Sequence, residues 1–384
     1  MEVIAGGTGG ASGWPEPGCR CASCLRAARV TPRTPSAVVV DGVLRLGLDG
    51  PAGEHGNHLV REIPGGWDVT APDGARLLYL GDPPADAAPY DVAFVDVLGD
   101  PFLLGALRAR RLMTAGTVVI AACADHRART PAELERLCAL WRVTVLSDGA
   151  SVTTVSYEKR GAYRVLVLGG ARSGKSERAE QRVAAEPAVT YVATGPAGDG
   201  DPEWAARVAA HRSRRPAWWR TVETTDVSEM LAGAEGTVLI DGIGTWLASV
   251  MDECGAWAGG TVELAGRVEE LTKAWRQTSA NVVAVSDETG LGVVPPTPAG
   301  RLFRDWLGRV NRALAAESEE AELVVAGRVI PLDSSLGNSL ITDAELGLVS
   351  GGLRWPAEGA GRYGRSSRPE VNQVWRAWLS SATS

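Results

Sequence analysis

Residues 169–176 read Gly-Gly-Ala-Arg-Ser-Gly-Lys-Ser and match the phosphate-binding pattern G-x-x-x-x-G-K-[ST] at every position. The apolar run 163–168 precedes them, and residues 177–185 follow with helical spacing. A strand that turns through glycines into a helix directs backbone N–H groups and the positive helix end at one place, where a polyphosphate binds. Lys175 is expected to reach the outer phosphates, and the Ser176 hydroxyl to help hold Mg²⁺. The stretch predicts a nucleotide site.

Strand and helix patterns alternate from this motif onward. Apolar β-runs occupy residues 163–168, 189–193, 237–240 and 281–286, with helical stretches between and after them, and the run 321–327 is expected to close the sheet. Such alternation implies parallel strands joined by crossover helices. We therefore expect an α/β fold with a RecA-like parallel P-loop sheet over residues 161–333.

Asp241 ends the apolar run that begins at Thr237. Phosphate-loop enzymes use a carboxylate at the end of a neighbouring strand to direct Mg²⁺ beside the hydroxyl of the loop. The alternative is that Asp241 only caps a turn. With the loop upstream, we favour the metal role.

Length and charge limit the classes of protein that the chain can represent. With 384 residues, two domains are the default expectation. A formal charge of −7 argues against a main role in binding nucleic acid, which needs a broad positive field. The first residues lack the basic and apolar segments of a leader, and no apolar run approaches the ~20 residues that cross a bilayer. We expect a cytoplasmic protein.

Residues 1–160 show a different pattern of expected strands and helices. Short apolar runs typical of strands alternate with turn-rich stretches, and helical spacing appears twice. This mixture indicates an α+β domain in which sheets are flanked by helices. Residues 334–384, rich in Gly, Ser and Arg, form an extension of unknown role with a short helical stretch at 369–379. The expected strands lie at 36–40, 76–80, 92–96 and 117–122, and the expected helices at 102–112 and 131–141.

His211 lies in a stretch with helical spacing that ends in three arginines before Pro216, and it is the only histidine after residue 126. An isolated histidine on a helix is usually a surface or packing residue, and a run of arginines is usually a solvated face. The residues alone leave a catalytic role open.

Five ordered blocks together resemble the bifunctional adenosylcobinamide kinase/adenosylcobinamide-phosphate guanylyltransferase family. The similarity covers about residues 163–332 and is far more specific than one phosphate loop. The blocks are residues 169–176, Val-Thr-Tyr-Val-Ala-Thr ending at Thr194, His-Arg-Ser-Arg-Arg-Pro-Ala-Trp-Trp-Arg-Thr-Val-Glu from His211 to Glu223, Ser-Asp-Glu-Thr-Gly-Leu-Gly-Val-Val-Pro at 286–295, and Phe-Arg-Asp-Trp-Leu-Gly-Arg-Val-Asn at 303–311.

The resemblance implies two reactions. ATP or GTP phosphorylates the aminopropanol hydroxyl of adenosylcobinamide, and a histidine in the H-R-x-R-R-P block then carries GMP from GTP to the phosphorylated corrinoid. His211 is the matching histidine, and a neutral imidazole is a competent nucleophile toward phosphorus near neutral pH. The family also implies Mg²⁺, an oligomer, and nucleotide contacts after Thr194. The other implied nucleotide contacts are Gly169, Gly170, Ala171, Arg172, Ser173, Gly174, Lys175, Ser176, Arg212, Arg215, Glu223 and Asp241.

The chain departs from the family pattern at one position near the site. The usual Asn-Glu pair after the fourth strand is Asp287-Glu288 here. A carboxylate facing the phosphates would repel them unless Mg²⁺ or an arginine intervenes.

The N-terminal residues 6–24 resemble the opening of metallo-β-lactamase-like phosphodiesterases, a fold of two sheets between helices. The His-x-His-x-Asp-His cluster of those hydrolases does not occur in the sequence, because His55 and His58 stand isolated. A catalytic di-metal site is therefore not expected, and the domain is interpreted as degenerate. Some relatives hold a structural zinc, and the matching ligands here are Cys19, Cys21, Cys24 and His126. The alternative is a set of unmetallated thiols.

Two other functions remain open from the sequence. One is a simpler P-loop kinase of small molecules without a covalent intermediate. The other is a nucleotide-responsive binding or regulatory protein, which the degenerate first domain and the Asp287 departure would suit.

Overall fold

The computed structural model describes the chain except for residues 31, 153–161, 196–208, 210–211 and 333–384. Met1–Ser334 forms one compact unit, and the extension with its predicted helix at 369–379 lies outside the described residues. Within residues 1–152 the strands are β1 (Val3–Gly7), β2 (Ala37–Val40), β3 (Leu44–Gly47), β4 (Gly50–Ala52), β5 (Leu59–Ile63), β6 (Gly66–Thr70), β7 (Arg76–Leu80), β8 (Val92–Val95) and β9 (Val118–Ala121), and the helices are α1 (Ala22–Ala27), α2 (Phe102–Ala109) and α3 (Pro131–Leu140).

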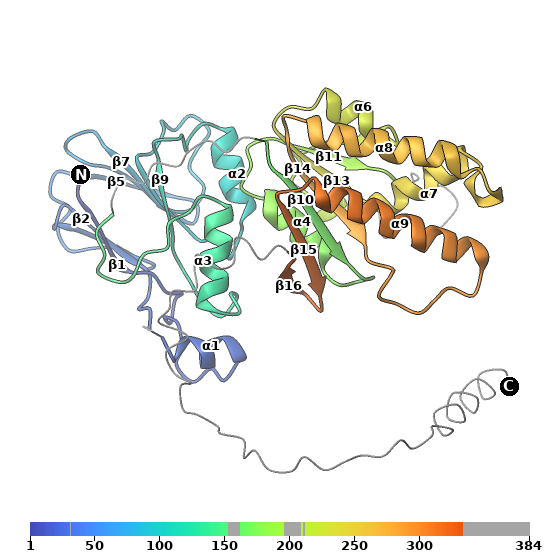
Figure 1. Ribbon diagram of the computed structural model, residues 1–384. Coiled ribbons are helices and arrows are strands. Elements are labelled where there is room, and N and C mark those ends of the chain that lie inside the picture. The colour runs from blue at the N-terminus through green and yellow to red at the C-terminus, as the bar shows by residue number, and fades with distance from the viewer. Residues whose placement is uncertain (31, 153–161, 196–208, 210–211, 333–384) are drawn as a thin grey trace, which may run out of the picture. The chain divides into compact units, whose positions relative to one another are not determined.

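From residue 162 onward the described part of the chain contains a second set of elements (Figure 1). The strands are β10 (Arg164–Gly169), β11 (Val189–Ala193), β12 (Arg220–Glu223), β13 (Thr237–Asp241), β14 (Asn281–Asp287), β15 (Glu320–Val325) and β16 (Arg328–Pro331). The helices are α4 (Lys175–Val183), α6 (Val227–Ala232), α7 (Ile243–Glu253), α8 (Thr261–Gln277) and α9 (Pro298–Ala316), with a 3₁₀ turn at Ala256–Ala258.

The N-terminal elements form two sheets, with strand orders β1-β2-β3-β4 and β5-β6-β7-β8-β9. The second is mixed, because β7, β8 and β9 pair in parallel while β5, β6 and β7 pair antiparallel. Alternate residues of β7 face opposite sides: Leu77 packs with Val38 and Leu46 of the first sheet, and Leu78 packs with Leu104 of α2 and Leu137 of α3. The predicted α+β class is confirmed, whereas the metallo-β-lactamase-like identity stays a prediction.

The strands from β10 to β16 form one sheet with the order β12-β11-β13-β14-β10-β15-β16. All neighbouring pairs from β12 to β15 are parallel. Alternate residues of β10 face different cores: Leu166 packs with α7, α8 and α9, and Val167 packs with α4. Figure 1 shows α7, α8 and α9 together on one side of this sheet. The predicted parallel α/β sheet is therefore confirmed.

The predicted single strand over residues 321–327 is wrong in its last part. Ala326 and Gly327 both have positive φ values, of 49° and 69°, so the chain turns there and returns as the antiparallel strand β16. The edge of the sheet on this side is therefore β16 and not β15. The edge strand on the other side, β12, was not expected from the sequence.

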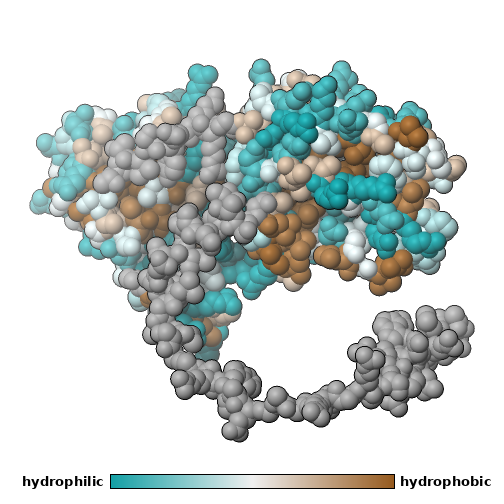
Figure 2. Space-filling view, viewed as in Figure 1, coloured by the Kyte–Doolittle hydropathy of each residue, from teal (hydrophilic) through white to brown (hydrophobic). Residues whose placement is uncertain are grey.

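The surface mixes polar and apolar side chains. Figure 2 shows hydrophobic patches separated by hydrophilic surface on the face that it draws. Val262, Leu291 and Val293 are among the exposed large apolar residues. Among the described helices, none is long and apolar enough to cross a bilayer.

Candidate nucleotide site and cysteine cluster

The phosphate-binding loop connects β10 to α4, as the sequence predicts. Gly174 precedes α4 with a φ of 94°, a left-handed conformation that a side chain would strain. At Gly169 a β-carbon would lie 2.4 Å from Oγ of Ser173, so only glycine fits there. The amide of Gly327, in the turn after β15, donates to the carbonyl of Ser173 over 2.8 Å. The turn between β15 and β16 thus supports the loop.

The predicted magnesium ligands lie together at the carboxyl edge of the sheet. Asp241 ends β13, and its Oδ1 is 3.5 Å from Oγ of Ser176 at the start of α4. Carboxylate and hydroxyl oxygens are the ligands that Mg²⁺ prefers. The spacing of the two oxygens is compatible with a shared Mg²⁺, and the metal role of Asp241 stays a prediction.

Tyr191 is a member of the site that the sequence analysis missed. Its hydroxyl donates to Oδ2 of Asp241 over 2.6 Å, and the guanidinium of Arg215 stacks on its ring at 3.7 Å. Burial and the neighbouring Asp241 raise the pKa of the Tyr191 phenol, so the hydroxyl keeps its proton. In the sequence Tyr191 looks like an ordinary core residue of a strand, and it gave no signal of this role.

Two further arginines, in the stretch just before Pro216, make ion pairs with neighbouring elements. Arg214 contacts Glu180 of α4 at 3.3 Å, although the sequence analysis did not single out this arginine. Arg212 pairs with Glu223, the last residue of β12, at 2.9 Å, in an exposed position. His211 itself and the stretch 196–208 after Thr194 lie outside the described residues. The nucleophile assignment therefore stays a prediction.

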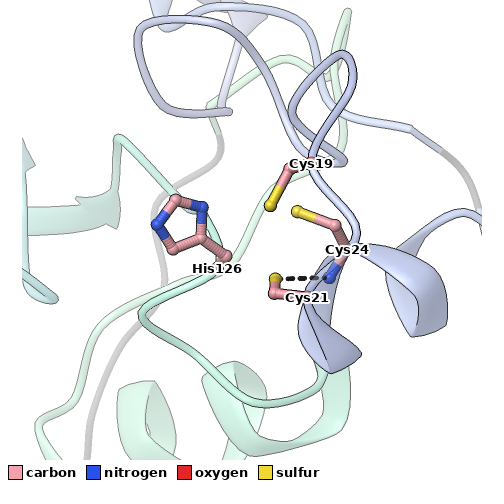
Figure 3. A group of neighbouring side chains, drawn as sticks. All are labelled: Cys19, Cys21, Cys24 and His126. Atoms are coloured by element: carbon pink, nitrogen blue, oxygen red, sulfur yellow. Dashed lines mark hydrogen bonds between the residues drawn. The ribbon is translucent and has the colours of Figure 1, made fainter.

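The four predicted zinc ligands come together in the N-terminal half (Figure 3). The sulfurs of Cys19, Cys21 and Cys24 and a ring nitrogen of His126 all lie within 4.8 Å of one another. Figure 3 shows that the cysteines come from the segment around α1 and the histidine from a different part of the chain. The amide of Cys24 donates to Sγ of Cys21 over 3.4 Å.

The thiols of this cluster differ in acidity. The hydrogen bond from the Cys24 amide lowers the pKa of the Cys21 thiol. Burial raises the pKa of the Cys24 thiol to about 11. Nδ1 of His126 lies 3.1 Å from Oε2 of Glu16, a contact that orients the ring. Outside this cluster, the two ring nitrogens of His58 contact Asp41 and the carbonyl of His55.

Comparison with known proteins identifies the family of the part of the chain that contains the nucleotide site. Residues 165–332 match CobU, described as "Cobinamide kinase / cobinamide phosphate guanyltransferase". The bifunctional adenosylcobalamin biosynthesis protein CobP of Pseudomonas aeruginosa is 41% identical over 177 residues, which are 44% of this chain and 96% of the relative. The chain belongs to this family. The CobU proteins of Salmonella typhimurium and Escherichia coli are each 38% identical over 175 residues, 42% of this chain and 96% of each relative.

Family membership confirms the predicted class of enzyme. The chain is a transferase of cobalamin biosynthesis, with the kinase and guanylyltransferase activities of its family. ATP and GTP as substrates are consistent with this membership. The matched residues begin at β10, so the comparisons say nothing about the N-terminal half.

Proposed function

We propose that the chain catalyses two successive transfers onto adenosylcobinamide at the site between the phosphate-binding loop and Asp241. The observation that supports this best is the 3.5 Å approach of the Ser176 and Asp241 oxygens beside Lys175, inside a domain of the family. In the first step a terminal phosphoryl group passes from ATP or GTP to the aminopropanol hydroxyl, which loses its proton, and the nucleoside diphosphate leaves.

The kinase step depends on positioning and charge. Phosphoryl transfer requires little covalent chemistry from the protein, so the residues of the site mainly position the nucleotide and balance its charge. Backbone N–H groups of the loop and the Lys175 ammonium bind the outer phosphates. Ser176 and Asp241 would hold Mg²⁺, which when bound would neutralise charge that develops on the phosphates. Arg215 lies at Tyr191 and is placed to neutralise a triphosphate or the leaving pyrophosphate.

The guanylyl step requires a nucleophile, and we assign it to His211. Its imidazole attacks the α-phosphorus of GTP, the bond to the β-phosphate oxygen breaks, and pyrophosphate leaves. A phosphate oxygen of the phosphorylated corrinoid then attacks the same phosphorus and releases the histidine. The product is adenosyl-GDP-cobinamide. The contacts of Arg212 with Glu223 and of Arg214 with Glu180 support this assignment, because they connect the residues that follow 211 to the end of β12 and to α4.

A turnover experiment with two variants tests the proposal. The purified chain, adenosylcobinamide, GTP and Mg²⁺ should give first the phosphorylated and then the GDP-linked corrinoid by mass spectrometry. His211→Ala should stop at the first product and take up no acid-labile label from α-³²P GTP. Lys175→Ala should make neither product. Label retained by His211→Ala would refute the assignment, and phosphorylation of other alcohols but not of the corrinoid would favour a different P-loop kinase.

We also propose that the N-terminal cluster holds a structural zinc ion. The three cysteines and His126 supply the four soft ligands of a closed tetrahedral site, whose sulfurs lie about 3.8 Å apart when Zn–S bonds are about 2.3 Å long. The observed spread of 4.8 Å fits such a site after a small contraction. Bound zinc would also stabilise the Cys24 thiolate, whose formation burial opposes. The oligomeric state, the cytoplasmic location and the domain boundary near residue 160 stay predictions.

A further inference from the structure

The Lys175 ammonium is paired with a carboxylate of the chain itself. Nζ of Lys175 lies 2.8 Å from Oδ1 of Asp287 and 3.3 Å from the carbonyl oxygen of Gly170. The lysine side chain is only 15% exposed, and that of Asp287 is 44% exposed. The Lys175 ammonium, which the outer phosphates of a nucleotide would contact, is therefore already paired with the carboxylate of Asp287.

The position of Asp287 follows from the strand order. Asp287 is the last residue of β14, which lies between β10 and β13, and it is in register with Gly169. The carboxylate thus stands between the phosphate-binding loop and the strand that ends in Asp241. A group here lies where the outer phosphates and their metal ion meet the protein.

A hydrogen bond from α9 holds the backbone of Asp287 in place. Nδ2 of Asn311, a buried residue of α9, donates to the carbonyl of Asp287 over 3.0 Å, and Oδ1 of Asn311 accepts from Ser286 over 2.6 Å. On the other side, a β-carbon at Gly244 would lie 3.1 Å from Oδ2 of Asp287. The backbone of Asp287 is therefore held at the site, and the glycine at position 244 leaves room for its carboxylate.

We propose that Asp287 makes the site selective for the magnesium complex of the nucleotide. The carboxylate competes with the phosphates for Lys175 and repels a metal-free triphosphate, which brings its full negative charge. The magnesium complex is less negative, and its metal ion can balance the carboxylate. Asparagine of the same size would remove the repulsion while leaving the backbone contacts in place. The inference rests on the proposed function only in requiring that a nucleotide binds at this loop.

Binding measurements on the full-length protein test the inference. A non-hydrolysable GTP analogue is titrated by calorimetry into the wild type and Asp287→Asn, once with Mg²⁺ and once with EDTA. We expect Asp287→Asn to bind the metal-free analogue about fivefold more tightly than the wild type, which corresponds to about 1 kcal/mol for a partly exposed ion pair. The magnesium complex should gain less than about twofold, so the preference for it falls.

The matched control is Glu288→Gln, which removes one negative charge at the next residue. Oε1 of Glu288 accepts from the amide of Gly290 over 3.0 Å. An equal gain in Glu288→Gln, or no gain in Asp287→Asn while the wild type binds the magnesium complex, would overturn the role of Asp287 and leave the proposed function intact. Failure of both proteins to bind the analogue under either condition would overturn both.

Discussion

Asp241 uses its two carboxylate oxygens for different partners. Oδ2 accepts the hydroxyl of Tyr191 over 2.6 Å, and Oδ1 faces Ser176 at 3.5 Å. The short bond holds one oxygen and thereby fixes the direction of the other. A carboxylate oriented in this way directs its second oxygen toward the serine hydroxyl, where a shared metal ion would be held.

Tyr191→Phe should weaken magnesium binding without preventing nucleotide binding. The substitution removes the hydrogen bond that orients Asp241, and loss of such supporting contacts typically costs 10- to 100-fold in metal affinity or activity. We expect the Mg²⁺ concentration for half-maximal kinase rate to rise about tenfold. Rates measured over a range of Mg²⁺ concentrations check this, with Asp241→Asn as the more damaging comparison. An unchanged magnesium dependence in Tyr191→Phe would contradict the orienting role.

The ionised side chain of Glu322 should stabilise the folded protein, and this stabilisation should be lost at acid pH. Its side chain on β15 is buried, and burial alone would raise its pKa, but hydrogen bonds and charges from Arg178 and Arg182 outweigh burial and lower it. A folded-state pKa below the usual value of 4.5 means that the stabilisation is fully present above that pH. It is lost as the pH falls through the lowered pKa.

The test compares urea unfolding of the wild type and Glu322→Gln. At about pH 7 the variant should lose about 3 kcal/mol, because both arginines are left without their buried partner. The two stabilities should converge as the pH falls through the lowered pKa of Glu322, because the wild-type carboxylate then becomes protonated as well. Glu317→Gln, which breaks an exposed pair with Arg276, is the control and should lose much less. If the difference in unfolding free energy between the wild type and Glu322→Gln did not change with pH, the ionisation of Glu322 would not contribute to stability.

Protein purified without chelator should contain about one zinc ion per chain by elemental analysis. Cys24→Ser should lose the metal and melt at a lower temperature, because the bound ion stabilises only the folded chain. Cys254→Ser changes a cysteine at the end of α7, outside the cluster, and should keep the metal. Zinc retained in full by Cys24→Ser, or absent from the wild type, would show that the thiols are unmetallated.

The sequence by itself determined those features that short spacing encodes. The glycines and Lys175 of residues 169–176 dictate a turn between strand and helix, and the run that ends at Asp241 marks a buried strand with a polar end. The close spacing of Cys19, Cys21 and Cys24 likewise indicates that three thiols lie close together. Each of these patterns lies within a few residues, where backbone geometry follows directly from residue type.

Only the tertiary structure decided which side chains meet. Tyr191 reaches Asp241 because β11 pairs with β13, and Asp287 reaches Lys175 because β14 lies between β13 and β10. Strand order is set by how the helices pack on both faces of the sheet. It cannot be predicted from β-propensity or from hydrophobic periodicity alone. The partners of the two carboxylates therefore became visible only when the whole sheet was in place.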